Sequence, residues 1–242
     1  MTGATSIAVA GSAGAEAVRA FDPFLPITTR AGGVELASLD TRVAQRMRRS
    51  QILATIRRHL TERGLAGVTV RGVTESCGHA VQTFYNLVGP RDRAIIDAVS
   101  EYTRFVGRAA QIQADDPYAL IKIINRWLES IDAQPEFCRQ VSLIFFSDAR
   151  SIYYEFRDGQ LYCMTRLLTE QQRAGVVRGD VNVRDLAEQL VLLSSALCLE
   201  WSDRPFPIEQ LHCRLRSGFE CLLANKLADD VRQQIGGLSR LN

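Results

Sequence analysis

The chain has 242 residues, of which 46% are hydrophobic and 23% are charged, and its formal net charge is +2. This is the composition of an ordinary soluble globular protein, and the length allows one large domain or two small ones. No run of about 18 uncharged apolar residues is present, so we expect no membrane-spanning segment. The six cysteines lack the paired spacing of a metal site or a disulfide framework, and we expect reduced, mostly buried thiols in the cytoplasm.

The positive charge is concentrated in one segment. Residues 41–93 contain ten arginines and three acidic residues, a net charge of +7, so the rest of the chain carries −5. Guanidinium groups attract phosphates by charge and by paired hydrogen bonds, and the segment therefore favours a polyanionic partner. A solvated, arginine-rich helix face would give the same pattern.

The first forty residues show no helical periodicity. They contain Pro23, Pro26, Gly32 and Gly33, and the opening stretch lacks the basic region of a secretory signal. We expect residues 1–40 to be a disordered N-terminal extension.

The first helix is predicted from about Thr41 to Gly64. Its apolar residues recur at four-residue spacing, which is typical of an amphipathic helix, and the glycine provides the stop. These apolar positions are Ile52, Ile56 and Leu60, with Leu53 beside them.

Two short helices follow around a glycine turn. Thr69 is placed to cap a helix that runs to Cys77, and Gly78 breaks it. A second helix fits Ala80–Leu87 and ends at Gly89-Pro90, because a proline disfavours helical geometry in the residue before it. This arrangement predicts a helix-turn-helix.

The remaining sequence is predicted to be helical throughout. Apolar stripes, or prolines and glycines at the ends of segments, indicate helices over the ranges 91–113, 117–134, 135–149, 152–174, 183–203 and 208–227. No alternating strand pattern of useful length appears. We therefore predict an all-α fold of about nine helices, with an N-terminal helix-turn-helix domain over 41–94 and a helical domain over 95–230.

A set of motifs between Gln45 and Ala94 resembles the N-terminal DNA-binding domain of the TetR family of transcriptional regulators. The motifs are Ile52-Leu53-Ala54, Gly64, Val68-Thr69-Val70-Arg71-Gly72-Val73, Cys77-Gly78, Gln82-Thr83-Phe84-Tyr85-Asn86 and Pro90-Arg91-Asp92. The resemblance implies a double-stranded DNA operator as partner, read through residues 80–86 in the major groove. The implied contacts are Arg48, Arg49, Thr69, Arg71, Ala80, Val81, Gln82, Thr83, Tyr85, Asn86 and Arg91.

These contacts divide by chemistry. The resemblance assigns Thr69, Arg71, Tyr85 and Arg91 to DNA phosphates, with Arg48 and Arg49 beside the backbone. The amides of Gln82 and Asn86 are able to bond the edge of an adenine, and Thr83 offers a methyl or a hydroxyl group.

The C-terminal layout is similar to the ligand-binding and dimerisation body of the same family. We expect a homodimer through the last two long helices, where Ser194-Ser195-Ala196 allows close approach, although their apolar stripes would also pack within one chain. We further expect a cavity for a small apolar or amphipathic effector, with no cofactor. The residues predicted to line it are Phe105, Trp127, Phe145, Phe146, Tyr153 and Met164, which core packing would explain equally well.

Other classes of function have less support in the sequence. No nucleophile-base pair, metal set or phosphate loop is recognisable, so we expect no enzyme. We predict a ligand-responsive repressor that binds a palindromic operator. The alternative is a helical protein-interaction module of the same shape, and an activator is compatible with the same motifs.

Overall fold

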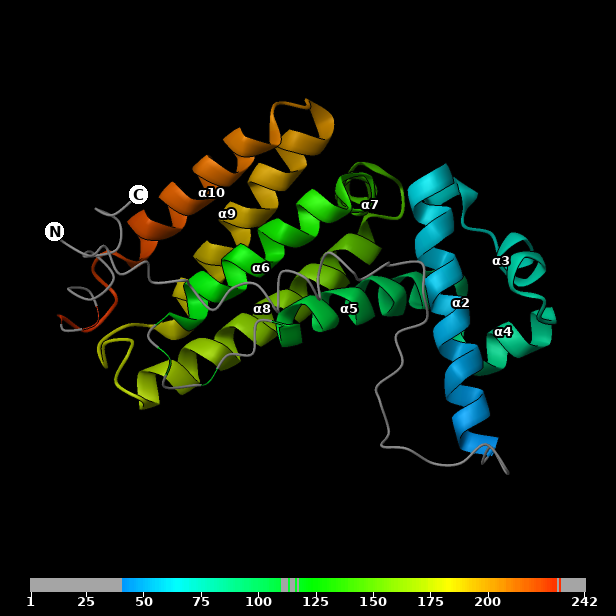
Figure 1. Ribbon diagram of the computed structural model, residues 1–242, viewed down its shortest axis with the longest axis horizontal. Coiled ribbons are helices and arrows are strands. Elements are labelled where there is room, and N and C mark those ends of the chain that lie inside the picture. Colours follow the sequence, from blue (N-terminus) through cyan, green and yellow to red (C-terminus); the bar gives the residue numbers. More distant parts are fainter. Residues whose placement is uncertain (1–40, 110–112, 114–115, 117, 230, 232–242) are drawn as a thin grey trace, which may run out of the picture.

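The computed structural model describes residues 41–109, 113, 116, 118–229 and 231. Within these residues it contains nine α-helices, two short 3-10 helices and no strand, which confirms the all-α prediction (Figure 1). The α-helices are α2 (Thr41–Arg63), α3 (Val70–Cys77), α4 (Val81–Val88), α5 (Arg91–Ala109), α6 (Ala119–Ala133), α7 (Pro135–Leu143), α8 (Arg150–Arg173), α9 (Val183–Asp203) and α10 (Ile208–Leu223). The expected N-terminal extension lies outside the described residues, as do 110–112 and 117 of two predicted helices.

The helices form two parts joined by α5. Figure 1 shows α2, α3 and α4 at one end of the molecule and α6 to α10 at the other. α5 packs against α2 in the first part and against α8 in the second, and α9 packs on α7, α8 and α10. Gly218 allows α10 to approach α9 closely, because a Cβ there would lie 2.6 Å from Cδ2 of Leu193, which would have to move.

Two predicted helices end earlier than the sequence pattern suggests. The range 135–149 is interrupted after Leu143 by a 3-10 turn, Ile144–Phe146. The hydroxyl of Ser147 donates to the carbonyl of Ile144 and accepts from the amide of Ala149, so local bonds replace the helical ones. α10 stops at Leu223 because the following backbone bonds instead to the α8–α9 connection, through Arg178 N to Lys226 O and Ala228 N to Val176 O.

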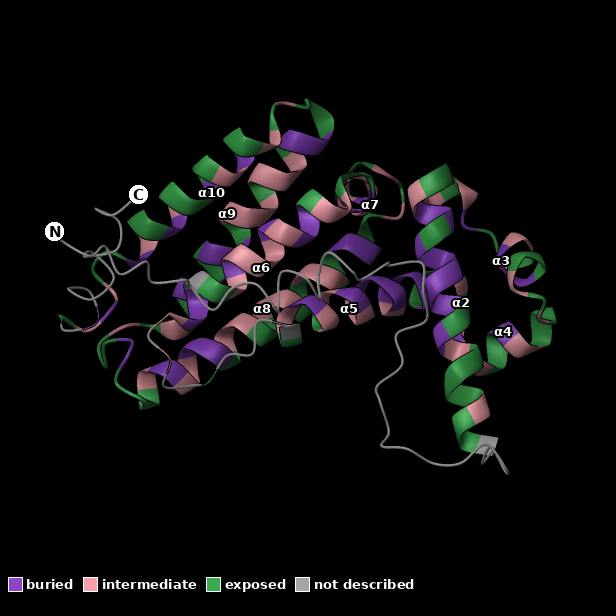
Figure 2. Cartoon of the chain, viewed as in Figure 1, coloured by how far each residue is buried: buried purple, intermediate pink, exposed green. Residues whose placement is uncertain are grey.

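Two clusters of buried apolar side chains hold the helices together, and the purple segments of Figure 2 mark them. The first joins α2, α3 and α4 to α5, α7 and the start of α8. The second joins α6, α8, α9 and α10. The predicted apolar stripe of α2 is confirmed, since Ile52, Leu53, Ile56 and Leu60 are buried, and α5 has a buried stripe of its own, formed by Ile95, Val99, Tyr102 and Val106. The first cluster therefore continues across the predicted domain boundary at residue 94, which stays a prediction.

The contact between α2 and α5 contains a buried charge. The exposed fraction of Arg57 is 0%, and its Nη1 donates to Glu101 Oε2 at 2.8 Å and to the carbonyl of Ala98 at 3.1 Å. Arg57 is thus one of the ten arginines of residues 41–93, but it faces the interior and not the solvent. It shares the apolar stripe of α2, because Leu53, Arg57 and Leu60 follow one another at spacings of four and three residues.

A second set of ion pairs continues from α2 to α8. Asp97 of α5 accepts from Arg49 of α2 at 2.6 Å and from Arg93 of its own helix at 3.0 Å. Arg93 also contacts Glu155 of α8 at 2.8 Å. Charged contacts therefore fix α5 to both parts of the molecule.

The cysteines do not match the expectation of mostly buried thiols. All six are free, as predicted, but Cys163, Cys213 and Cys221 are exposed because they lie on the outward faces of α8 and α10. None of the described helices combines the length and the apolar character that crossing a membrane requires.

We expect Arg57→Ala to lower the free energy of unfolding by about 3–5 kcal/mol, because it leaves the carboxylate of Glu101 without its buried partner. The matched control is Arg58→Ala, on the exposed side of the same turn, with an expected change within about 0.5 kcal/mol. Urea denaturation measures both. Equal losses for the two variants would contradict the role of the ion pair.

Candidate nucleic-acid interface

The turn between α3 and α4 has the predicted construction. Thr69 caps α3, and its Oγ1 accepts from the amide of Gly72 at 3.1 Å. Gly78 ends α3 in the left-handed conformation, with φ of 68°, which side chains other than glycine adopt only with strain. Ala80 caps α4 without a side-chain hydrogen bond, so packing must hold this helix in place.

α4 presents two different faces. Phe84 and Val88 are buried in the first cluster and fix the helix to α2. The opposite face exposes Val81, Gln82, Tyr85 and Asn86, while Thr83 is half-buried beside it. Nε2 of Gln82 donates to Oδ1 of Asn86 at 2.9 Å, so the two amides form one polar surface.

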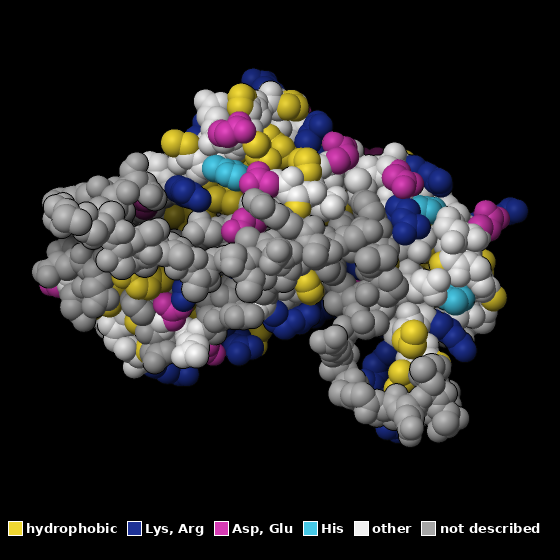
Figure 3. All heavy atoms as spheres, viewed as in Figure 1, with side chains coloured by type: hydrophobic (Ala, Val, Ile, Leu, Met, Phe, Trp, Pro, Cys, Tyr) yellow, Lys and Arg dark blue, Asp and Glu magenta, His cyan; other side chains and the backbone are white. Residues whose placement is uncertain are grey.

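Groups suited to phosphates surround this exposed face. The side chain of Arg71 is 87% exposed, and its ion pair with Glu75 raises the pKa of the guanidinium, which stays charged. The hydroxyl-bearing residues Thr69 and Tyr85 are exposed, and the Tyr85 ring packs edge-on against Phe84 with its centroid 5.8 Å away. Arg48 is exposed on α2. In Figure 3, Lys and Arg side chains lie on the visible face of this end of the molecule.

Two of the arginines predicted to contact DNA bind residues of other elements of the protein. Arg91 donates from Nε to the carbonyl of Val68 at 2.5 Å and from Nη2 to that of Leu65 at 2.6 Å. It thereby holds the segment before α3 against the start of α5. Arg49 is paired with Asp97 at the contact between α2 and α5. Substitution of either arginine would therefore change the domain as well as its surface.

A cavity of about 80 Å³, partly open to solvent, lies among α5, α6, α7, α8 and α9. Two of the six predicted ligand residues, Trp127 and Tyr153, line it. The other four do not: Phe105 and Phe145 pack against the first cluster, Met164 packs against the second, and Phe146 is exposed. The hydroxyl-bearing residues of the wall were not predicted to line it, and Ser194 and Ser195, which we expected at the dimer contact, lie here, because serines within a leucine-rich helix carry no signal that they face a cavity.

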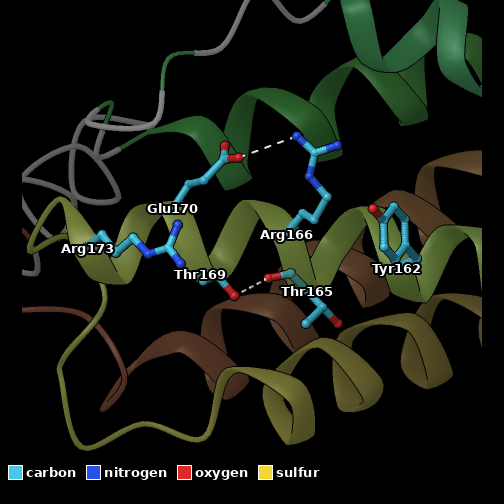
Figure 4. A pocket seen from close by; sticks show the side chains of 6 residues that line it. All are labelled: Tyr162, Thr165, Arg166, Thr169, Glu170 and Arg173. Atoms are coloured by element: carbon cyan, nitrogen blue, oxygen red, sulfur yellow. Dashed lines mark hydrogen bonds and ion pairs between the residues drawn. The ribbon is translucent and has the colours of Figure 1, made fainter.

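A second hollow follows the outer side of α8 (Figure 4). Its described lining residues come from that helix alone, and they include Tyr162, Arg166, Glu170 and Arg173. None of the predicted ligand residues belongs to it.

The chain matches no family model and no curated protein. Among solved structures, it is similar to a TetR-family transcriptional regulator from Pectobacterium atrosepticum, with 23% identity over 78% of this chain and 99% of that chain, and a TM-score of 0.53. FadR from Thermus thermophilus, a TetR-family transcriptional repressor solved with lauroyl-CoA, gives 16% identity, 74% and 95% coverage and a TM-score of 0.57. The chain has the TetR fold. The fatty acid degradation regulator FadR from Bacillus halodurans gives 16% identity, 73% and 95% coverage and a TM-score of 0.56.

Within this TetR fold, the helix-turn-helix contains a buried histidine that the sequence did not single out. His59 of α2 is 2% exposed, and its Nε2 lies 2.9 Å from Oγ of Ser76 in α3. Burial lowers the pKa of His59 below its ordinary value of 6.5, and the nearby charge of Arg63 lowers it further. The folded domain therefore favours the neutral ring.

We expect the stability of the protein to fall as the pH drops below about 6.5, because the unfolded chain binds a proton at His59 that the folded chain resists. His59→Gln retains a hydrogen-bonding group but does not titrate. Urea denaturation at pH 7.5 and 5.5 should show a smaller loss for the variant than for the original protein. Identical losses would mean that His59 does not set the pH dependence of stability over this range.

Proposed function

We propose that the protein is a DNA-binding transcription regulator that acts as a ligand-responsive repressor on a palindromic operator in the cytoplasm. The observation that carries the proposal is the exposed face of α4, where side chains that read bases stand beside side chains that hold phosphates. The TetR fold supports it, because the similar solved proteins named above are regulators.

The base-reading part of the interface is formed by α4. Gln82 and Asn86 are adjacent on the exposed face and would each offer an amide to an adenine edge once their mutual hydrogen bond opens. Val81, Thr83 and Ala80 would supply apolar contacts to thymine methyl groups. Thr69, Arg71, Tyr85 and Arg48 would fix the helix in the groove through phosphates.

A homodimer would supply the second half of the interface. α9 and α10 pack side by side and expose Leu192, Ala196, Cys213, Ser217 and Cys221, a surface of small and apolar side chains suited to a four-helix contact. Two-fold symmetry would place two copies of α4 in successive major grooves, roughly 34 Å apart.

The proposed response to an effector runs through α5. This helix contributes Val99, Tyr102 and Val106 to the cavity wall and Glu101 to the ion pair with Arg57 of α2. A ligand that binds better when α5 is displaced would move α2 and change the spacing of the two α4 helices. The coupling needed is typically 1–3 kcal/mol.

A protein-interaction module is the second candidate function, since the exposed Val81 and Tyr85 would also suit a protein partner. Selection from a random duplex pool, followed by titration at several salt concentrations, separates the two. A palindromic sequence with a steep salt dependence supports the regulator. Absence of enrichment with folded protein would favour the interaction module.

Substitutions on the interface should divide by contact type. Arg71→Ala and Tyr85→Phe should weaken binding to every duplex alike, and Arg71→Ala should reduce the salt slope by about 1. Gln82→Ala or Asn86→Ala should instead lose about 1–3 kcal/mol of discrimination at particular base pairs.

The matched control for Arg71→Ala is Arg166→Ala on α8. Arg166 is also exposed and paired with a glutamate four residues on, Glu170, but it lies on the body. Fluorescence anisotropy with the selected duplex and its point variants measures all five proteins. Equal weakening by the two arginine variants would refute the placement of the interface on α3 and α4.

We expect Leu192→Glu to shift the protein toward monomers, because a dimer through α9 and α10 would bury the new charge. The control is Tyr162→Glu on α8, where the original residue is 65% exposed against 46% for Leu192, and it should leave the oligomeric state unchanged. Sedimentation equilibrium measures both. Dissociation by the control alone would move the proposed interface to α8.

A further inference from the structure

The wall of the 80 Å³ cavity contains many hydroxyl groups for a site within a helical core. Thr103, Ser130, Ser142 and Ser194 all line it, and each comes from a different helix, α5, α6, α7 and α9 respectively. Ser130 and Ser142 are buried. No charged side chain occurs among the described residues that line the cavity.

These hydroxyl groups already use their protons within their own helices. Thr103 donates to the carbonyl of Val99, Ser130 to that of Trp127, and Ser142 to that of Cys138. Ser194 donates to Leu190 or Val191. A hydroxyl has one proton and two lone pairs, so the oxygens of Thr103, Ser142 and Ser194 keep lone pairs that serve the cavity as hydrogen-bond acceptors, while Ser130 is also bonded to Tyr102.

We infer that the cavity binds a small, uncharged molecule that donates a hydrogen bond, of the alcohol or phenol class. The wall also holds donors, in the amide of Gln160 and the indole of Trp127, but no described lining cation would neutralise a buried carboxylate. An ammonium would find acceptors but no carboxylate, and burial of an unpaired charge is costly. The class deepens the proposed function, because it specifies the effector.

The apolar part of the wall and the volume restrict the ligand further. Rings of Tyr102, Trp127 and Phe137 line the same space. The volume is far below the roughly 300–1,000 Å³ of sites for drug-sized molecules and nearer to the ~150 Å³ of an apolar cavity that accepts benzene. A molecule with a single ring is therefore the largest ligand that the cavity can accept.

The pKa values of the ionisable groups that line the cavity also favour a neutral ligand. Burial raises the pKa of the thiol of Cys198 to about 12, and it raises the pKa of Tyr102 and Cys138 as well. The same surroundings that keep these groups uncharged disfavour an anion in the cavity.

Calorimetric titration of the full-length protein without DNA, using four compounds that share one ring, tests the inference. Phenol should bind, and toluene, which replaces the hydroxyl with a methyl group, should bind about three- to ten-fold more weakly. Benzoate and benzylammonium should bind at least about ten-fold more weakly than phenol. Equal binding of toluene, binding of a charged compound as tight as that of phenol, or binding of none of the four would overturn the inference.

A cavity variant locates the binding. The triple variant carries Thr103→Val, Ser142→Ala and Ser194→Ala. Its affinity for phenol should be about five-fold weaker, and its affinity for toluene should change by less than about two-fold. The control is Thr165→Val with Thr169→Val, which removes hydroxyls of the same backbone-bonded kind from the outer hollow of α8 and should change neither. Loss of phenol binding in the control alone would place the site outside the cavity.

The outcome is separable from that of the proposed function. Duplex binding by the same preparation is measured independently. Duplex binding without phenol binding would overturn the ligand class alone, and phenol binding without duplex binding would overturn the regulator alone.

Discussion

The buried guanidinium of Arg57 is the constraint on which the arrangement of the two parts depends. A charge at 0% exposure is tolerated only where its partners are in place, and here they are the carboxylate of Glu101 and the carbonyl of Ala98. All three groups lie where α2 crosses α5. Apolar side chains on both helices would also pack in other registers, whereas this ion pair fits only one. The Arg49–Asp97–Arg93 contacts reinforce the same register from the edge of the interface.

This register links the cavity to the helix-turn-helix over a short distance along α5. Glu101 faces Arg57, and the next two residues, Tyr102 and Thr103, line the cavity. A displacement of α5 that changes its contacts on the cavity side would therefore also change its contact with Arg57. Because α5 is a continuous helix, no flexible segment separates the two contacts.

Much of the fold follows from the sequence, because apolar stripes and glycine or proline stops are local signals. They predicted α2 to α5 and α9 closely. The predicted ends of α7 and α10 were wrong, because the actual ends depend on Ser147 and on backbone hydrogen bonds between loops that are distant in sequence. The exposed face of α4 was also predictable, because Phe84 and Val88 identify its buried side. A cavity was also predicted, but of its lining only Trp127 and Tyr153 were, since whether an aromatic side chain lines a space or fills the core is decided by all five surrounding helices at once.

The position of α4, and so of its exposed face, depends on tertiary packing far more than on interactions within the helix itself. The helix has eight residues, no side-chain bond at its N-cap, and two buried anchors. A helix this short has little stability of its own in water, so its orientation is that of the surface on which it packs. That surface is formed by α2, α3 and α5, and the buried ion pair fixes α2 to α5. The groups suited to reading DNA are therefore positioned by a charge pair in a different interface, and a change there would reach them without altering any residue of α4.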